Sequence, residues 1–198
     1  RKRMSVKNIT YFTQNKSTNE TIHILDFGYH NTTQGKPSTQ TVVDHYSLHC
    51  IVDGKGTYRV HDQTYSLQQN DCFLLLPNTP IRYQSDEENP WIYYWIGFDG
   101  IDALHMMQLC NISYQSPVLH YGNIEELTSI IEPLTLLPTS TIADNYMALG
   151  QFYTLCSKLI QYNTSIKLPS RQEDYVNQAI AMIQNSYYKN ISVQDICD

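Results

Sequence analysis

The sequence predicts a chain in two parts, an all-β half of short strands followed by a helical half. Between residues 21 and 98, short segments rich in Thr, Val, Ile and Tyr are separated by turn residues about every ten positions, which is typical of a β-sandwich or β-barrel. After Gly100 the apolar residues recur with the period of a helix. A hydrophobic content of 41% and a net charge of −6 over 198 residues exclude a mainly disordered chain.

The strands expected in the β half alternate apolar and polar residues or form short apolar runs between turn residues. Asp53–Gly56 predicts a tight hairpin because its glycines permit positive φ angles. The two prolines of Pro77–Pro80 end the apolar run before them, since proline cannot continue a central strand. The expected strands are Thr21–Tyr29, Val42–Val52, Thr57–Val60, Thr64–Leu67, Cys72–Leu76, Ile81–Gln84 and Trp91–Phe98.

Helices are expected between residues 101 and 163. The first begins at Ile101 and ends near Asn111. The second, Ile124–Leu137, follows the capping residue Asn123 and is interrupted at Pro133. The third has the clearest pattern, because its apolar residues recur at alternating steps of four and three. This apolar stripe consists of Ile142, Tyr146, Leu149, Tyr153, Cys156 and Ile160.

The remaining residues predict a linker and the start of a further domain. Two pairs at the spacing of a capping box, Ser170 with Glu173 and Ser192 with Asp195, each open a helix. The second of these helices stops after one turn at Asp198, so we expect the natural protein to continue. The expected division is a β domain at 1–100, a helical region at 101–163, a linker at 164–173 and the start of another domain at 174–198.

Composition and motif spacing exclude several functional classes. No apolar run approaches the roughly 18 residues of a membrane span, and Arg1–Arg3 do not precede the apolar core of a signal peptide, so we expect a cytoplasmic protein. The five cysteines include no Cys-x-x-Cys pair, which favours reduced, buried thiols over zinc or redox motifs. No phosphate-binding loop, nucleophile elbow or His-Glu-x-x-His motif is present.

Three segments of the β half carry specific motifs, namely Asp44–Gly56, Leu67–Pro80 and Pro90–Gly100. Together they resemble the sensor domain of AraC-type transcription regulators, in particular the sugar-responsive branch with the multiple-sugar, raffinose and melibiose regulators. Residues 176–198 resemble the first helices of that family's DNA-binding domain. The resemblance implies a mainly β plus α fold, with a cupin-like jelly-roll β-barrel, antiparallel dimerisation helices and the start of a helix-turn-helix domain.

The same resemblance implies a function. It indicates a cytoplasmic, non-enzymatic sensor that binds a mono- or oligosaccharide and controls sugar-utilisation genes, with activation the habit of the family. The partners it implies are the sugar, a second copy of the chain, and DNA contacted through a region largely beyond this chain. Neither a cofactor nor a membrane is implied.

Sugars are bound by aromatic rings that stack on their apolar faces and by a few polar groups that converge on their hydroxyls. Alternate residues of a strand share a face, so Trp91, Tyr93 and Trp95 point to one side of the last strand. The resemblance places Tyr83, Tyr93 and Trp95 in the ligand pocket. The full set of candidate ligand-binding residues is Tyr83, Tyr93, Trp95, Trp91, His49, His45 and Thr39. The alternative is that these rings only fill the barrel.

The apolar stripe of the third helix is the candidate dimer interface, and packing on the barrel is its alternative. Two other classes of protein remain open. A dimerisation module with an empty barrel or a non-sugar effector would keep the same fold. A metal-dependent cupin enzyme would need a His-x-His pair. Here His45 and His49 are four residues apart, about 13 Å on a strand, which is too far to share one ion.

Overall fold

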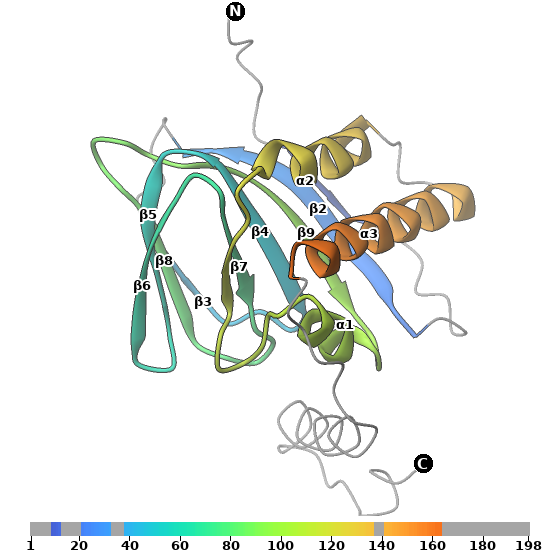
Figure 1. Ribbon diagram of the computed structural model, residues 1–198, viewed down its shortest axis with the longest axis horizontal. Helices are drawn as coiled ribbons and strands as arrows, with labels where there is room; N and C mark the ends of the chain where they lie inside the picture. The colour runs from blue at the N-terminus through green and yellow to red at the C-terminus, as the bar shows by residue number, and fades with distance from the viewer. Residues whose placement is uncertain (1–8, 13–20, 33–37, 137–140, 164–198) are drawn as a thin grey trace, which may run out of the picture.

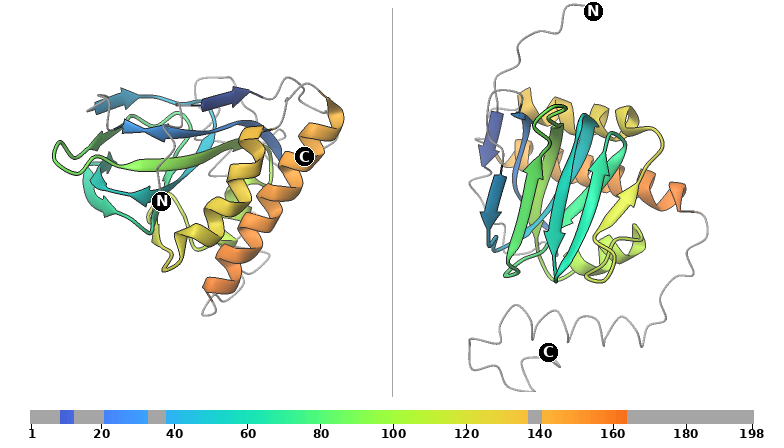
Figure 2. Two further views of the ribbon diagram at one scale, coloured as in Figure 1. Left: turned by 90° about the horizontal axis from the view of Figure 1, so that it is seen from above. Right: turned by 90° about the vertical axis from the view of Figure 1, so that its left-hand side faces the viewer.

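The computed structural model describes residues 9–12, 21–32, 38–136 and 141–163. They form two antiparallel β-sheets that face each other, with helices packed outside one of them (Figures 1 and 2). The predicted class, mainly β with added helices in a cupin-like arrangement, is confirmed. The two sheets stay separate and do not close into one continuous barrel.

Strands far apart in the sequence are neighbours in both sheets, and every strand pairing is antiparallel. The six-stranded sheet has the order β1 (Ile9–Phe12), β2 (His23–Asn31), β9 (Ile92–Asp99), β4 (Tyr46–Asp53), β7 (Asp71–Leu75) and β10 (Val118–His120). The four-stranded sheet has the order β3 (Ser38–Thr41), β8 (Ile81–Ser85), β5 (Lys55–Val60) and β6 (Gln63–Gln68). Connections that cross from one sheet to the other are typical of jelly rolls.

The helices are α1 (Ala103–Leu109), α2 (Ile124–Ile131) and α3 (Ile142–Tyr162), with a 3-10 helix, η2 (Glu132–Leu136), directly after α2. In Figure 2, α2 and α3 lie side by side on the face of the six-stranded sheet that points away from the other sheet. None of the described helices combines the length and the apolar run that crossing a lipid bilayer requires.

Local sequence explains how these helices begin and end. The α-helical hydrogen-bond pattern changes to a 3-10 helix at Pro133, because proline has no N–H to donate to the preceding turn. The helix α3 begins with a capping box, in which Thr141 Oγ1 accepts from the N–H of Asp144 at 3.2 Å and Asp144 Oδ2 accepts from the N–H of Thr141 at 3.0 Å. This Thr-x-x-Asp signal was present in the sequence.

The central strands β4 and β9 are buried on both faces. Their inner face meets the four-stranded sheet, where the His49 ring lies 5.8 Å from that of Tyr83. Their outer face meets the helices, where the Phe98 ring lies 4.6 Å from that of Phe152 in α3. Double burial explains why the first six residues of β4 are all buried, including the polar Ser47 and His49.

Two sequence predictions about β4 were wrong. The strand expected at Val42–Val52 begins only at Tyr46, because residues 42–45 form an isolated bridge, Val43 with Pro77, and a bend. His45 therefore precedes the strand. The turn at Gly54, which has a φ of 78°, leads from β4 in one sheet to β5 in the other, so Asp53–Gly56 is a corner between sheets and not a hairpin.

The strands β1, β3 and β10 were not predicted. Each is only three or four residues long and lies at the edge of its sheet, where it pairs with a single neighbour. Such strands need no regular apolar pattern, so the sequence signal is weak. The predicted linker at 164–173 and the further domain at 174–198 lie outside the described residues. The four described cysteines are buried free thiols, as predicted.

Candidate ligand-binding site

The predicted aromatic residues converge between the two sheets. Tyr93 and Trp95 point inward from β9, His49 from β4 and Tyr83 from β8. The His49 ring is the centre of this group, with its centroid 4.9 Å from Tyr93, 5.8 Å from Tyr83 and 6.1 Å from Trp95. The register explains the meeting, since His49 pairs with Trp95 across β4 and β9. We call His49, Tyr83, Tyr93 and Trp95 the inner site.

A chain of hydrogen bonds crosses the inner site. The hydroxyl of Tyr93 is 3.0 Å from Nδ1 of His30, and it also bonds to the hydroxyl of Tyr83. Tyr83 bonds in turn to Thr39, its direct partner in the pairing of β3 with β8. Burial raises the pKa of both tyrosines above the usual 10, so both stay neutral at pH 7. Neutral phenols can donate to a ligand or accept from it.

His49 has a buried nitrogen without a hydrogen-bond partner among the described residues. The residue is 4% exposed, and its Nε2 lies 3.1 Å from Oγ of Ser47, while Nδ1 has none. Burial lowers the pKa of His49 from 6.5 to about 3, so the ring is neutral at pH 7. A buried polar atom without a partner is costly, and a ligand hydroxyl would satisfy it.

Asp26 on β2 completes the polar part of the site, and sequence reasoning missed it. The residue is 8% exposed, and its carboxylate accepts a hydrogen bond from Nε1 of Trp95 at 2.8 Å. Nε2 of His45 lies 2.9 Å from its other oxygen. The available signal was a carboxylate within the otherwise apolar run Ile24–Phe27 of a predicted strand. Asp26 thus fixes the orientation of the Trp95 ring.

His45 belongs to the site through Asp26. Both of its ring nitrogens face carboxylates, because Nδ1 lies 2.7 Å from Oδ1 of Asp44. Burial opposes the charged form of His45, but the hydrogen bonds to Asp26 and Asp44 outweigh burial and raise its pKa above 6.5. The sequence predicted His45 and His49 on one strand face, whereas His45 approaches from the bend before β4.

Trp91, also predicted to bind the ligand, lies at a closed part of the interior. It is 1% exposed, and its ring stacks on Phe73 with centroids 5.6 Å apart and an angle of 21° between the planes. Its ring centroid is 6.4 Å from that of Tyr83 and 6.2 Å from that of Tyr93. Trp91 therefore packs against the inner-site rings of Tyr83 and Tyr93 and helps to hold them in place.

The predicted dimer stripe divides between surface and core. Ile142, Tyr146, Tyr153 and Ile160 are 67%, 56%, 41% and 36% exposed, and Leu149 is half-buried. Cys156 does not belong to this surface, because it is 1% exposed and its carbonyl accepts a hydrogen bond from the thiol of Cys110. The helix turns Cys156 toward the protein interior, so a partner contact there is not available to it.

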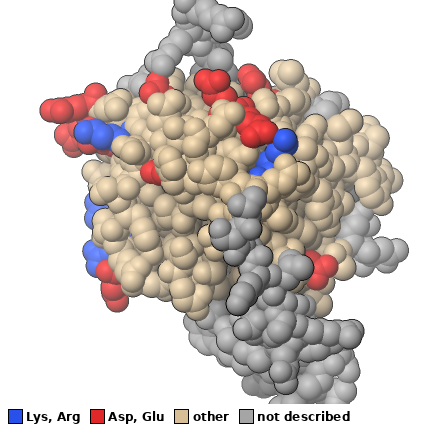
Figure 3. Space-filling model, viewed as in Figure 1, with Lys and Arg blue, Asp and Glu red and all other residues tan. Residues whose placement is uncertain are grey.

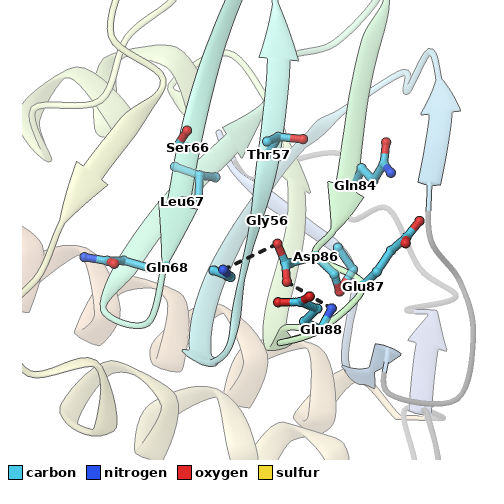
Figure 4. Close-up of a pocket in the computed structure, with 11 residues that line it drawn as sticks. Gly56, Thr57, Ser66, Leu67, Gln68, Gln84, Asp86, Glu87 and Glu88 are labelled. Atoms are coloured by element: carbon cyan, nitrogen blue, oxygen red, sulfur yellow. Dashed lines mark hydrogen bonds and ion pairs between the residues drawn. The ribbon is translucent and has the colours of Figure 1, made fainter.

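Two surface hollows lie elsewhere, on the outer face of the four-stranded sheet. One, of about 760 Å³, is lined by residues such as Thr57, Ser66 and Gln84 and by the acidic loop Asp86–Glu88 (Figure 4). The other, of about 370 Å³, is lined in part by Arg59 and Arg82. Neither has the aromatic faces on which sugars stack. In the described part of the chain, no group of three or more His, Cys, Asp or Glu could hold a metal ion.

The two histidines are expected to give the folded state opposite pH dependences. Since the pKa of His49 falls from 6.5 to about 3 on folding, the unfolded chain binds a proton below pH 6.5 that the folded chain does not. The free energy of unfolding should therefore fall as the pH drops from 6.5 toward 3, by at most about 1.4 kcal/mol per pH unit. The raised pKa of His45 means that its stabilisation is full below pH 6.5 and lost at higher pH.

Urea unfolding at a series of pH values tests this assignment. His49→Phe should flatten the acid side of the profile, and His45→Gln should flatten the alkaline side, so that each variant is the control for the other. An unchanged acid slope in His49→Phe would show that His49 is not held neutral in the fold.

The fold and the geometry of its interior define a class of protein, the cupin-like ligand-binding domains. A comparison with protein families agrees, since the AraC-like ligand binding domain matches residues 26–146, more than half of the chain. The chain therefore belongs to the AraC-like ligand-binding domain family.

Similar full-length proteins are regulators of operons. The Msm operon regulatory protein of Streptococcus mutans is 28% identical over 175 residues, covering 86% of this chain and 63% of that protein. The lactose operon transcription activator of Staphylococcus xylosus is 30% identical, covering 79% and 57%. The raffinose operon transcriptional regulatory protein RafR of Pediococcus pentosaceus is 31% identical, covering 79% and 58%. This chain thus spans about three fifths of the length of these relatives, all three of which are named as regulators of operons.

Similar solved structures include the following three. The AraC-like transcriptional activator CuxR is 12% identical, with 95% of this chain and 73% of that chain covered and a TM-score of 0.47. ToxT from Vibrio cholerae is 14% identical, with 82% and 70% covered and a TM-score of 0.43. A cupin protein from Bacteroides fragilis is 13% identical, with 48% and 80% covered and a TM-score of 0.36.

Proposed function

We propose that this chain is the effector-sensing and dimerisation part of a cytoplasmic transcription regulator that responds to a mono- or oligosaccharide. The regulator controls sugar-utilisation genes, as an activator, and is not an enzyme. Two of the relatives regulate operons named for lactose and raffinose, which supports a sugar effector. The observation that carries the proposal is the inner site, where aromatic faces surround the buried Nδ1 of His49 that has no partner among the described residues.

The chemistry of the inner site suits an uncharged polyol. The rings of Tyr93 and Trp95 offer flat surfaces for the apolar face of a sugar. Neutral His49 can accept a hydrogen bond at Nδ1, while the hydroxyls of Tyr83 and Thr39 can exchange bonds with sugar hydroxyls. In this proposal Trp91 and His45 act indirectly, by supporting the rings and Asp26.

The division of the chain proposed from the sequence links sugar binding to DNA binding. The sensing domain is 1–100, the dimerisation region 101–163, the linker 164–173 and the start of the helix-turn-helix domain 174–198. A sugar that binds one arrangement of the homodimer more tightly shifts the population toward that arrangement. The shift would change how the full-length protein contacts DNA, through residues that largely lie beyond this chain.

Calorimetric titration with lactose, raffinose, galactose and glucose tests the proposal. At least one sugar is expected to bind and to change the tryptophan fluorescence, since the chain has only two tryptophans and both lie in or against the inner site. His49→Phe should weaken that binding by about 10–100-fold, because a buried hydrogen bond is lost while the aromatic packing is kept.

His120→Phe is the control, since His120 lies on the edge strand β10 with a side chain 57% exposed. It should bind sugar as the unaltered chain does. Binding of no sugar in the panel would contradict the sugar sensor and favour a dimerisation module with an empty interior or a non-sugar effector.

A further inference from the structure

The inner site contains a buried negative charge that sugar stacking does not require. Asp26 is 8% exposed, and its two oxygens bond to Trp95 at 2.8 Å and to His45 at 2.9 Å. A carboxylate has about four lone-pair sites, so each oxygen can still accept a bond from a ligand hydroxyl. The carboxylate can therefore bind a hydrogen-bond donor directly, whereas a second anion beside it would be repelled.

No lysine or arginine side chain of the described segments reaches the inner site. The Lys and Arg residues in those segments each keep more than a third of their side chains in solvent, and they are Lys55, Arg59, Arg82 and Lys158. Arg59 and Arg82 alternate along their strands with the inward-pointing Tyr58 and Tyr83, so they lie on the outer face of the four-stranded sheet.

Neither His45 nor His49 offers a positively charged N–H to a ligand, and Nδ1 of His30 lies 3.0 Å from the hydroxyl of Tyr93. Both nitrogens of His45 face carboxylates, at 2.9 Å from Asp26 and 2.7 Å from Asp44, so no N–H of His45 remains for a ligand. His49 is neutral at pH 7 and can offer only an uncharged hydrogen bond. A phosphate in the site would lose its hydration, pair with no Lys or Arg and lie near the carboxylate of Asp26. Its binding free energy would therefore be unfavourable.

We propose that Asp26 is a specificity-determining residue that restricts the inner site to uncharged sugars and excludes phosphorylated ones. This inference rests on the proposed function of the inner site as a sugar site. It makes the regulator respond to a free sugar rather than to the phosphate ester that the first step of sugar breakdown would form from it. The carboxylate contributes by charge and also by accepting bonds from sugar hydroxyls.

Calorimetry on the 198-residue chain with paired ligands tests the inference. The pairs are galactose with galactose 6-phosphate, glucose with glucose 6-phosphate, and lactose with its 6-phosphate, and 6-O-acetylgalactose serves as an uncharged ligand of similar bulk. For any sugar that binds, the phosphate ester is expected to bind at least about a hundredfold more weakly. The acetyl ester should bind more tightly than the phosphate ester.

Two variants identify the residue responsible. Asp26→Asn should reduce the ratio of the affinity for the sugar to the affinity for its phosphate ester by about tenfold or more. The substitution removes the negative charge and keeps the shape of the side chain. Asp44→Asn is the matched control, since Asp44 also contacts His45 but its side chain is 92% exposed, and it should leave the ratio unchanged. A ratio measured on one variant is insensitive to partial unfolding, because both ligands meet the same folded fraction.

Three results would overturn the inference and leave the sugar site standing. In the first, the phosphate ester binds as tightly as the sugar. In the second, the acetyl ester binds as weakly as the phosphate ester. In the third, the ratio of the two affinities is the same in Asp26→Asn as in the unaltered chain. If neither the sugars nor their esters bind, the proposed function itself is wrong, and the inference falls with it.

Discussion

Replacing Tyr153 with Glu is expected to convert a homodimer of this chain into monomers. Along α3, apolar and aromatic side chains stay in solvent at Ile142, Tyr146, Tyr153 and Ile160, although such residues usually avoid it. The helix carries only two charged residues, Asp144 and Lys158, and the side of the molecule with α3 shows mostly uncharged surface (Figure 3). A two-fold axis would place each new carboxylate in the same buried interface, without a cation to pair with it.

The control for this prediction is the adjacent residue. Thr154 is exposed but lies about 100° further around the helix, away from both the stripe and the core. Sedimentation velocity should show a monomer for Tyr153→Glu and a dimer for Thr154→Glu and for the unaltered chain. A dimer that survives Tyr153→Glu would remove α3 from the interface. Leu149→Glu is less informative, because Leu149 is half-buried and its replacement also disturbs the core.

Replacing Trp91 with Ala is expected to reduce the free energy of unfolding by about 3–5 kcal/mol, a large part of the usual stability of a domain. The ring is 1% exposed and stacks on Phe73, so its removal leaves a cavity between the sheets. Gly56 leaves room for this ring, since a Cβ on Gly56 would approach it to 2.6 Å. Trp91→Phe keeps part of the packing and should lose less.

Urea denaturation of Trp91→Ala, Trp91→Phe and Leu136→Ala measures these differences. Leu136 is 83% exposed, so its truncation should change the stability by less than about 0.5 kcal/mol. If Trp91→Ala were as stable as the Leu136 control, Trp91 would not be a packing residue, and a direct role in ligand contact would replace the supporting role assigned here.

Much of the fold was predictable because its signals are local. Tyr93 and Trp95 share the inner face of β9, as the alternation of residues indicates, and Trp91 lies directly before this strand with its ring beside that of Tyr93. Tyr83 follows the same rule on β8. The four- and three-residue steps of α3 were likewise sufficient to predict that helix. Edge strands such as β3 were missed, since a strand with one neighbour needs little pattern.

The candidate site was only partly predictable. The sequence named the aromatic residues and His49, but not Asp26, whose bond to Trp95 joins residues 69 positions apart. That contact exists because β2 lies beside β9 in the sheet, and no local pattern encodes the order of strands. The position of the His45 side chain could not be predicted from neighbouring residues either, because it depends on the bend before β4 and on the position of Asp26.

The order of a β domain followed by helices could be derived from the amino-acid sequence alone, as could the apolar, aromatic and turn-forming positions of each element. Those properties follow from the periodicity of strands and helices, which is written in neighbouring residues. Three features follow from the packing of distant segments instead. Asp26 contacts Trp95, Nδ1 of His49 is buried in the aromatic interior, and Cys156 faces the core while Tyr153 faces solvent. Each of these depends on how sheets and helices pack together, and the free energy of that packing belongs to contacts between distant segments.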